Sequence, residues 1–290
     1  MSMVKNEDVR IAARRRAMSA TNATADKTAE RNIEYLSAPA KVSMADRWFE
    51  IASIDHFWVR RRFAVLQRLA GEELSGAHHM AEIGCGHGLL QRQIEDAYGH
   101  EVTGFDLNEY ALKQNLSRRS RVCCYDIFQM NARFKEQFDL IFLFDVLEHI
   151  ADEDGFLRAV LFHLAPGGKL VINVPAGQWA YSAYDVAAGH VRRYSIQMLR
   201  ECADRSQFKV AGWTYWGLPL VPTLMLRKLW LWGRRDQARI ISAGFDTRTP
   251  GINNVLGLLA KCEVIPQKLL GTSLMAVLHR ETREHRNGFR

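Results

Sequence analysis

The sequence lacks the features of a membrane-spanning or disulfide-stabilised protein. Its 290 residues contain no uninterrupted apolar run of about eighteen residues, as a transmembrane helix needs. The N-terminus is polar and Arg-rich, without the apolar segment of a signal peptide. Cysteine occurs five times, an odd number, with no Cys-x-x-Cys pair, which argues against a zinc site and a disulfide framework. These absences predict a cytoplasmic protein in a reducing compartment.

A block of like charge is absent as well. The net charge is +7, but the basic residues are scattered, so composition gives no support for a nucleic-acid partner. Apolar residues make up 48% of the chain and charged residues 24%, as in ordinary globular proteins. A chain of this length predicts one full hydrophobic core with additions.

Predicted strands alternate with predicted helices from about residue 79 onward. We expect strands at 79–83, 101–105, 121–125, 138–144 and 169–174, with helices at 89–97, 109–116 and 152–164. The continuous apolar run Phe138–Phe144 is typical of a central strand that is buried on both faces. This alternation predicts a doubly wound, Rossmann-like α/β fold with a parallel sheet.

The additions surround this core. Apolar residues at helical spacing between Asp46 and Leu69 predict a helical cap. A polar loop of nearly twenty residues leads to Tyr194, a length typical of functional loops. A helix follows from Ser195, and Phe208–Trp216, Asn253–Ile265 and Leu274–His279 predict a strand, a helix and a last strand. We expect a flexible basic tail over 1–42, the helical cap over 43–75, the core over 76–217, a helical substrate or interface insertion over 218–270, the final core strand over 271–281 and a tail over 282–290.

A glycine-rich turn follows the first core strand. It reads Ala81-Glu82-Ile83-Gly84-Cys85-Gly86-His87-Gly88, and its three glycines allow a tight turn and a close approach of backbone to ligand. A helix that begins here points free N–H groups at that ligand. The spacing is Gly-x-Gly-x-Gly and not the Gly-x-Gly-x-x-Gly of dinucleotide sites, which favours a nucleoside ligand without a pyrophosphate.

Acidic residues end the next two strands. Asp106 follows the second strand, where a carboxylate accepts hydrogen bonds from both ribose hydroxyls. Asp126 follows the third strand, where a carboxylate accepts from an adenine amino group. The neighbouring Leu107 and Ile127 are expected to pack on the same ligand. Three successive strand ends therefore carry groups suited to a nucleoside.

With these motifs, the sequence resembles class I methyltransferases that use S-adenosylmethionine (SAM). The resemblance runs in order from Glu82 to Val174 and includes the segments 138–141, 145–150 and 166–168. It implies a seven-stranded sheet whose last strand, Leu274–His279, is antiparallel. It also implies a SAM site made by Glu82, Gly84, Gly86, Gly88, Asp106, Leu107, Asp126, Ile127 and Phe144.

A narrower resemblance extends to the flanking segments. Residues 56–62, 174–176, 189–195, 253–263 and 271–274, together with Asp185, are similar to a bacterial subgroup associated with saccharides, lipid-linked glycans or secondary metabolites. It implies O-methylation of a small or lipid-linked polar metabolite. N- or C-methylation in secondary metabolism is the alternative. A nucleic-acid methyltransferase would carry a motif such as Asn-Pro-Pro-Tyr where Phe144-Asp145-Val146-Leu147 stands, and a non-catalytic SAM-binding protein would show a damaged cofactor site.

Two histidines are candidate general bases for methyl transfer. His149 follows the fourth strand, and Asp145, Glu148 and His149 resemble an acid-x-x-Glu-His pattern that quinone-type O-methyltransferases link to a divalent cation. We expect no metal and keep this cation site as the alternative, beside a purely structural role. His190 lies in the polar loop.

Basic residues beside these histidines are candidate ligands for the substrates. Arg192, Arg193 and Tyr194 are candidates for binding an anionic acceptor, or else form a structural salt-bridge network. Arg62, next to Trp58, is a candidate partner of the cofactor carboxylate, or else a solvated residue of a packed helix.

The stretch Leu218–Trp232 is aromatic and apolar and ends in basic residues. Three roles stay open for it: contact with the inner membrane surface, binding of an apolar acceptor, and plain packing or homodimer formation.

Overall fold

The computed structural model describes residues 32–40, 52–231 and 250–281, and the compact unit considered below begins at Ile33. Several predicted segments lie outside these ranges. They are residues 1–31, 41–42 and 282–290 of the expected tails, residues 43–51 of the helical cap and residues 232–249 of the insertion.

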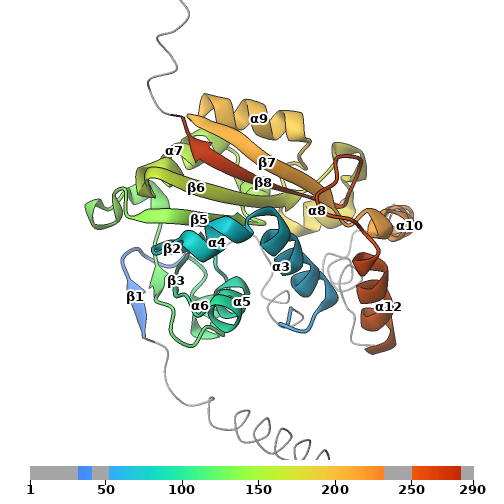
Figure 1. Cartoon of the computed structure of the whole chain (residues 1–290), viewed down its shortest axis with the longest axis horizontal. Helices are drawn as coiled ribbons and strands as arrows, with labels where there is room; N and C mark the ends of the chain where they lie inside the picture. The colour runs from blue at the N-terminus through green and yellow to red at the C-terminus, as the bar shows by residue number, and fades with distance from the viewer. Residues whose placement is uncertain (1–31, 41–51, 232–249, 282–290) are drawn as a thin grey trace, which may run out of the picture. The chain divides into compact units, whose positions relative to one another are not determined.

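The fold is built on an eight-stranded sheet in the order β1-β4-β3-β2-β5-β6-β8-β7 (Figure 1). Its strands are β1 (Ile33–Tyr35), β2 (Met80–Ile83), β3 (Val102–Asp106), β4 (Val122–Cys124), β5 (Phe138–Phe144), β6 (Leu164–Pro175), β7 (Phe208–Trp216) and β8 (Ser273–Arg280). The first six strands pair in parallel, whereas β8 runs antiparallel to both β6 and β7. The predicted doubly wound sheet with an antiparallel last strand is confirmed.

The edge strand β1 corrects two expectations at once. It adds an eighth strand to the seven expected, and it lies within the range 1–42 that was predicted to be a flexible tail. Ile33 pairs with Val122 of β4 in parallel register. Beyond the strand, the N–H groups of Leu36 and Ser37 both donate to the carbonyl of Cys124, at 2.9 and 3.0 Å. Three residues are too few to show an alternating pattern, so the sequence carried no sign of this strand.

Helices cover both faces of the sheet. They are α3 (Phe57–Leu69), α4 (Gly71–Gly76), α5 (Leu89–Tyr98), α6 (Glu109–Lys113), α7 (Glu153–His163), α8 (Ala183–Ala188), α9 (Ile196–Arg205), α10 (Val221–Leu231) and α12 (Pro250–Lys261). Along β5, Ile141 and Leu143 belong to one core cluster, with α7 and α9, while Phe142 belongs to the other, with α3, α4 and α5. This alternation, with apolar residues on both sides, explains the continuous apolar run of β5. No helix in the described ranges has both the length and the apolar character to cross a bilayer.

The long segment after β6 is more ordered than the sequence indicated. It was predicted to be a polar loop, but it contains the short helix α8 and the 3₁₀ turn η4 (Gln178–Ala180). Ser182 and Asp185 form a reciprocal capping box at the start of α8. The helix is too short for a periodic pattern, which is why the loop prediction was wrong here. Its effect is to hold His190 near the carboxyl ends of the strands.

Candidate cofactor and acceptor site

A cavity of about 750 Å³ opens at the carboxyl ends of β2, β3, β4 and β5. This volume lies within the range of small-molecule sites, and such sites in open α/β sheets occur at this edge. Nearly all the residues expected to hold the cofactor line it: Arg62, Glu82, Gly84, Gly86, Asp106, Leu107, Asp126, Ile127 and Phe144.

The glycine-rich turn after β2 is held tightly against β3. The N–H groups of Gly84 and Cys85 both donate to the carbonyl of Phe105, at 2.7 and 3.1 Å. Gly84 has a φ of +75°, and a Cβ at this position would meet Cγ2 of Val146 at 2.3 Å. The turn therefore requires glycine, and it places backbone against the cavity with no side chain between.

Gly88 has a different role from the one expected. It is the N-cap of α5 with a φ of +76°, and it is not among the residues that line the cavity. A Cβ there would meet the side-chain amide of Asn115 at 2.5 Å. The prediction that Gly88 contacts the cofactor is therefore corrected: the position needs glycine for backbone conformation and for packing against Asn115.

The carboxylate of Asp106 is fixed by two backbone donors. Oδ2 accepts from the N–H of Gly86 at 2.7 Å, and Oδ1 accepts from the N–H of Asn108 at 2.8 Å. Burial raises the pKa of Asp106 above its usual value, and these two hydrogen bonds oppose that shift. Each carboxylate oxygen keeps a further lone pair, so the pair of ribose hydroxyls of SAM fits this group.

Asp126 is held by the segment that follows β1. Its N–H donates to Oγ of Ser37 at 2.8 Å, and its own Oδ1 accepts from the N–H of Phe128 at 3.0 Å. In the same segment, the N–H of Ala40 donates to the carbonyl of Leu107 at 3.0 Å. Residues 36–40 therefore brace the loops where a ribose and an adenine are expected, a contribution that sequence reasoning missed.

Glu82 is a buried carboxyl group at the end of β2. Burial raises its pKa to about 8, although the nearby Arg62 guanidinium acts in the opposite direction. Its Oε2 atom is buried and has no hydrogen-bond partner among the described residues. A buried polar atom of this kind is costly unless a ligand satisfies it, which fits a polar group of the cofactor at this position.

Arg62 faces the cavity, but it already has a carboxylate partner. Its Nη1 donates to Oδ2 of Asp145 at 2.5 Å, and Oδ1 of Asp145 accepts from Nδ2 of Asn173 at 2.8 Å. The guanidinium lies 4.8 Å from the ring centroid of Trp58 and 5.1 Å from that of Phe144. Arg62 therefore borders the cofactor position as part of an ion pair and not as a solvated side chain.

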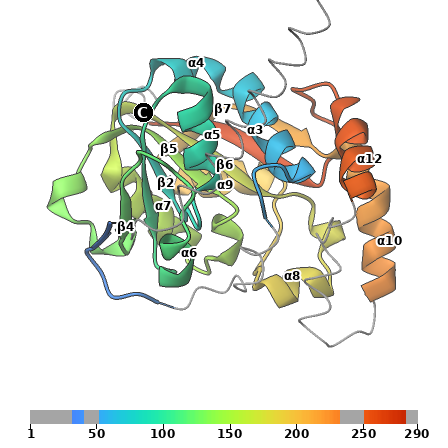
Figure 2. The ribbon, with the colours of Figure 1, turned by 90° about the horizontal axis from the view of Figure 1, so that it is seen from below.

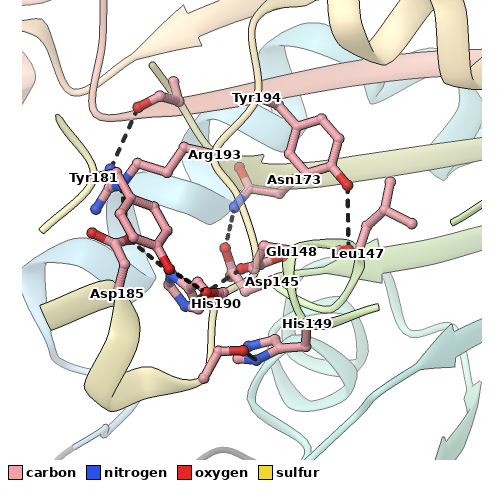
Figure 3. Close-up of polar contacts among 12 residues, drawn as sticks. Asp145, Leu147, Glu148, His149, Asn173, Tyr181, Asp185, His190, Arg193 and Tyr194 are labelled. Atoms are coloured by element: carbon pink, nitrogen blue, oxygen red, sulfur yellow. Dashed lines mark hydrogen bonds and ion pairs between the residues drawn. The ribbon is translucent and has the colours of Figure 1, made fainter. Parts of the chain in front are cut away.

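His190 is fixed at the other end of the cavity by Asp185 (Figure 3). The Nδ1 atom of His190 lies 2.9 Å from Oδ1 of Asp185, which also accepts from Nε of Arg193 at 2.7 Å. Oδ2 of Asp185 accepts from the N–H of Ser182 at 2.9 Å. Burial acts to raise the pKa of Asp185, but the bonds from His190 and Arg193 outweigh it, so the pKa is lowered. Asp185 is therefore a fully bonded anion that orients the imidazole.

His149 lies beside His190 in a largely buried environment. Its Nδ1 is 3.2 Å from the carbonyl of Gly189, and its ring packs edge-on against that of His190 with centroids 4.8 Å apart. Burial, together with the charge of His190, lowers the pKa of His149 to about 4. At neutral pH, His149 is therefore an uncharged imidazole and a weak base.

One group of donor atoms here has the spacing of a metal site, but its members differ from those expected. Glu148, His149 and His190 each offer a ligand atom, and these atoms lie within 4.8 Å of one another. Asp145 is not part of the group, because Arg62 and Asn173 bind its two oxygens. The alternative cation site was predicted with Asp145, Glu148 and His149. The structure places His190, and not Asp145, together with Glu148 and His149. Burial, reinforced by the Asp145 charge, raises the pKa of Glu148 well above its usual value.

Arg192 and Tyr194 do not reach the cavity. Arg192 forms an ion pair with Glu153, and the hydroxyl of Tyr194 donates to Oε2 of the same glutamate at 2.8 Å. Tyr194 is fully buried, and neither residue is among those that line the cavity. The prediction that they bind the acceptor is corrected, since their partners lie on α7. Arg193, which does line the cavity, fits that prediction in its position.

The outer wall of this end is formed by the segments after β7. No residue of these segments was predicted from the sequence to belong to the site. Leu220 of the 3₁₀ turn η5 (Leu218–Leu220), Leu224 and Arg227 of α10, and Leu256 of α12 line the cavity. Arg227 lies 4.3 Å from the ring centroid of Tyr184 on α8. Burial raises the pKa of Tyr184 to about 12. This end therefore combines an apolar wall with aromatic and cationic side chains.

Comparison with known proteins agrees with the geometry of the cofactor end. The family model described as a methyltransferase domain matches residues 51–211, more than half of the chain. The chain belongs to this methyltransferase family. From this membership and the geometry of the site we infer that it is an enzyme and that its cofactor is SAM.

Curated relatives also match this chain, but each match covers only part of the relative's own length. A ubiquinone biosynthesis O-methyltransferase from Idiomarina loihiensis is 31% identical over 119 residues, which are 38% of this chain and 48% of that protein. The phosphoethanolamine N-methyltransferase 2 of Caenorhabditis elegans is 32% identical over 130 residues, or 43% of this chain and 30% of that protein. The match to the ubiquinone relatives spans about half of their length.

Solved structures are similar to this chain at low sequence identity. The [4+2]-cyclase SpnF has a TM-score of 0.51 at 16% identity, covering 77% of this chain and 82% of that one. A SAM-dependent methyltransferase from Archaeoglobus fulgidus has a TM-score of 0.48 at 17% identity, covering 76% and 94%. A fold shared with a cyclase does not specify the reaction, so the acceptor chemistry depends on the side chains of the site.

Proposed function

We propose that this methyltransferase methylates a hydroxyl group of a small or lipid-linked polar metabolite, with His190 as the general base. The observation that carries the proposal is the Asp185–His190 pair, whose histidine lines the same cavity as the cofactor residues. The cavity volume of about 750 Å³ suits a cofactor together with a small acceptor group.

The hydrogen bonds of His190 favour the tautomer that a base requires. In the neutral imidazole of His190, the contact with the Asp185 carboxylate places the proton on Nδ1, which donates to it, and leaves the lone pair on Nε2. The carboxylate also stabilises the imidazolium that forms when Nε2 takes the hydroxyl proton. SAM, when bound, supplies an already activated methyl group. The protein's task is therefore to align the acceptor oxygen with that methyl group, to exclude water and to accept one proton.

Arg193 supports the role of His190 as a base indirectly, through Asp185. Its Nε binds the oxygen of Asp185 that also meets His190, and its Nη1 donates to the carbonyl of Ala176 at 3.4 Å. These contacts keep Asp185 ionised, so Arg193 acts through the base and borders the acceptor.

The relatives favour O-methylation without establishing it. Several curated relatives are named as O-methyltransferases of ubiquinone biosynthesis, and their matches cover less than half of this chain. One relative is named as a phosphoethanolamine N-methyltransferase, which supports N-methylation as the alternative. A neutral amine attacks without first losing a proton, so an N-methyltransferase would depend far less on a base.

The test uses labelled SAM and a small-molecule extract of the source organism. Transfer of the labelled methyl group into a product identifies the acceptor by its mass gain of one methyl. We expect His190→Asn to lower kcat by about 10²–10⁴-fold, because a positioned general base contributes this much, while the SAM dissociation constant stays unchanged.

His149→Asn is the matched control, since His149 lies beside His190 but is a weak base. It should lower kcat much less. Equal effects of the two substitutions, or loss of SAM binding with His190→Asn, would contradict the proposed base. A carbon spectrum of the product distinguishes an O-methyl from an N-methyl group.

A further inference from the structure

An exposed apolar surface covers the outer side of α10 and α12. On α10, Leu226, Leu229 and Trp230 are 68%, 59% and 52% exposed. On α12, Val255, Leu258 and Leu259 are 59%, 67% and 43% exposed. Figures 1 and 2 both place the two helices at the same end of the described region. We call these six residues the α10–α12 face. The spacing i, i+3, i+4 places the three residues of each helix on one side of it, and exposed apolar residues gathered in this way mark a site of contact with a partner or a membrane.

The same two helices form the outer wall of the acceptor end of the cavity. Leu224 and Arg227 of α10 and Leu256 of α12 line the cavity, while the face residues of the same helices point to solvent. Thr223, which also lines the cavity, is itself exposed, so the cavity reaches the surface at α10. A molecule that covers the α10–α12 face would therefore be one helix thickness from the acceptor.

The charges of this region have one sign. Within Val221–Leu231 and Pro250–Lys261 there is no aspartate or glutamate, and the charged residues are Arg227, Lys228 and Lys261. Glu263, just beyond α12, is buried and forms an ion pair with Arg61 at 3.2 Å. Arg227 lines the cavity and Nζ of Lys228 donates to the carbonyl of Trp179, so Lys261 is the exposed cation beside the apolar face within these two helices, without a compensating carboxylate there.

We propose that the α10–α12 face binds the surface of a bilayer that contains anionic lipid, and that the acceptor is an amphiphile that enters the cavity from that surface. Apolar side chains inserted at the headgroup level, with lysines beside them, are the pattern of a peripheral membrane contact. A second copy of the chain fits less well. A symmetric contact through this face would bring the exposed Lys261 of both copies to the interface, with no carboxylate on either helix to offset it. The statement about the acceptor rests on the proposed function, whereas membrane binding does not.

The experiment is flotation of the full-length chain with vesicles, at low salt. Vesicles of phosphatidylcholine alone are compared with vesicles that also contain phosphatidylglycerol. We expect the protein to float with the anionic vesicles and to be released by high salt. The double variant Leu226→Glu/Leu258→Glu should weaken this binding by about tenfold or more, because it places two carboxylates at the apolar contact.

Leu116→Glu is the matched control. Leu116 is an exposed leucine, 42% exposed, that follows α6 and is not part of the α10–α12 face. It should float like the unmodified protein. SAM titration of all the variants checks that each is folded.

Three results would overturn the proposal. They are failure of the unmodified protein to float with anionic vesicles, equal flotation of the double variant, and sedimentation as a dimer that the double variant converts to a monomer. The last result would assign the face to a second copy. None of these readouts depends on methyl transfer, so loss of activity in His190→Asn with normal flotation concerns only the proposed reaction. Flotation that fails beside normal turnover concerns only the membrane.

Discussion

The two ends of the cavity are built in different ways. At the cofactor end, the groups come from the carboxyl ends of β2, β3 and β4, which lie close together in the sequence, and backbone atoms hold them in place. At the acceptor end, the groups come from α8, α10 and α12, which are distant in the sequence, and side chains hold one another through Asp185. The cofactor end is thus encoded locally, whereas the acceptor end exists only after folding.

The largest effect is expected where the cofactor end depends on one side chain. Asp106→Ala removes the carboxylate that orients Gly86 and faces the expected ribose, so SAM affinity should fall by about 100-fold in a calorimetric titration. Asp139→Ala is the control, because Asp139 accepts from the N–H groups of His78 and His79. These residues precede β2 and so lie at the opposite edge of the sheet. This control should lower stability and leave SAM affinity unchanged. Equal losses of affinity would mean that the cofactor does not meet Asp106.

A smaller effect is expected where the acceptor end joins the sheet. Asn173 is fully buried; it donates to Asp145 and accepts from Nε1 of Trp216 at 2.9 Å. Asn173→Ala removes the hydrogen bonds to both Asp145 and Trp216, so the free energy of unfolding in urea should fall by about 2–4 kcal/mol. Gln197→Ala, on the exposed side of α9, should change it little. A stability loss no larger than that of Gln197→Ala would show that this network does not support the acceptor end.

The buried histidines predict a pH dependence. The pKa of His149 in the folded protein is about 4, below that of an exposed histidine, so the unfolded chain binds a proton first as pH falls. The part of the free energy of unfolding that depends on an uncharged His149 is therefore fully present above about pH 6.5. It falls by about 1–3 kcal/mol on acidification toward pH 4.

Urea unfolding at a series of pH values measures this effect. His149→Gln should flatten the curve over that interval. His87 and His163, whose pKa values burial also lowers, contribute to the slope that persists in the variant. A variant with the same slope as the unmodified protein would contradict the assigned environment of His149.

The smallest effect is expected at the edge of the cofactor end. Ser37→Ala removes the acceptor for the N–H of Asp126, so SAM affinity should weaken by less than about tenfold, as for one neutral hydrogen bond. Ser75→Ala, which removes an exposed hydroxyl on α4, is the control. Unchanged affinity in Ser37→Ala would mean that the segment after β1 does not support the adenine position.

The difference between the two ends of the cavity explains which features could be predicted from the sequence. The alternation of strands and helices, the glycine turn and Asp106 follow from local patterns, because period, turn residues and strand ends are properties of short segments. Phe138–Phe144 and Phe208–Trp216 were predicted with the bounds that the structure has. The failures have a shared cause. Gly88 meets Asn115 and Tyr194 meets Glu153 across long sequence separations, which no local pattern records.

The acceptor end shows the same limit in its charges. Arg192 and Arg193 are adjacent and of one type, yet the first pairs with Glu153 on α7 and the second with Asp185 at the cavity. The sequence identifies a basic pair but not the direction of either side chain. The partnership of Asp185 and His190 depends on α8, a helix too short to predict.

Titration of the full-length chain with SAM in a calorimeter tests the central claim most directly. The account predicts one SAM bound per chain, with a dissociation constant in the micromolar range. Absence of any binding heat at concentrations up to about a millimolar, from a protein that still unfolds cooperatively, would contradict it.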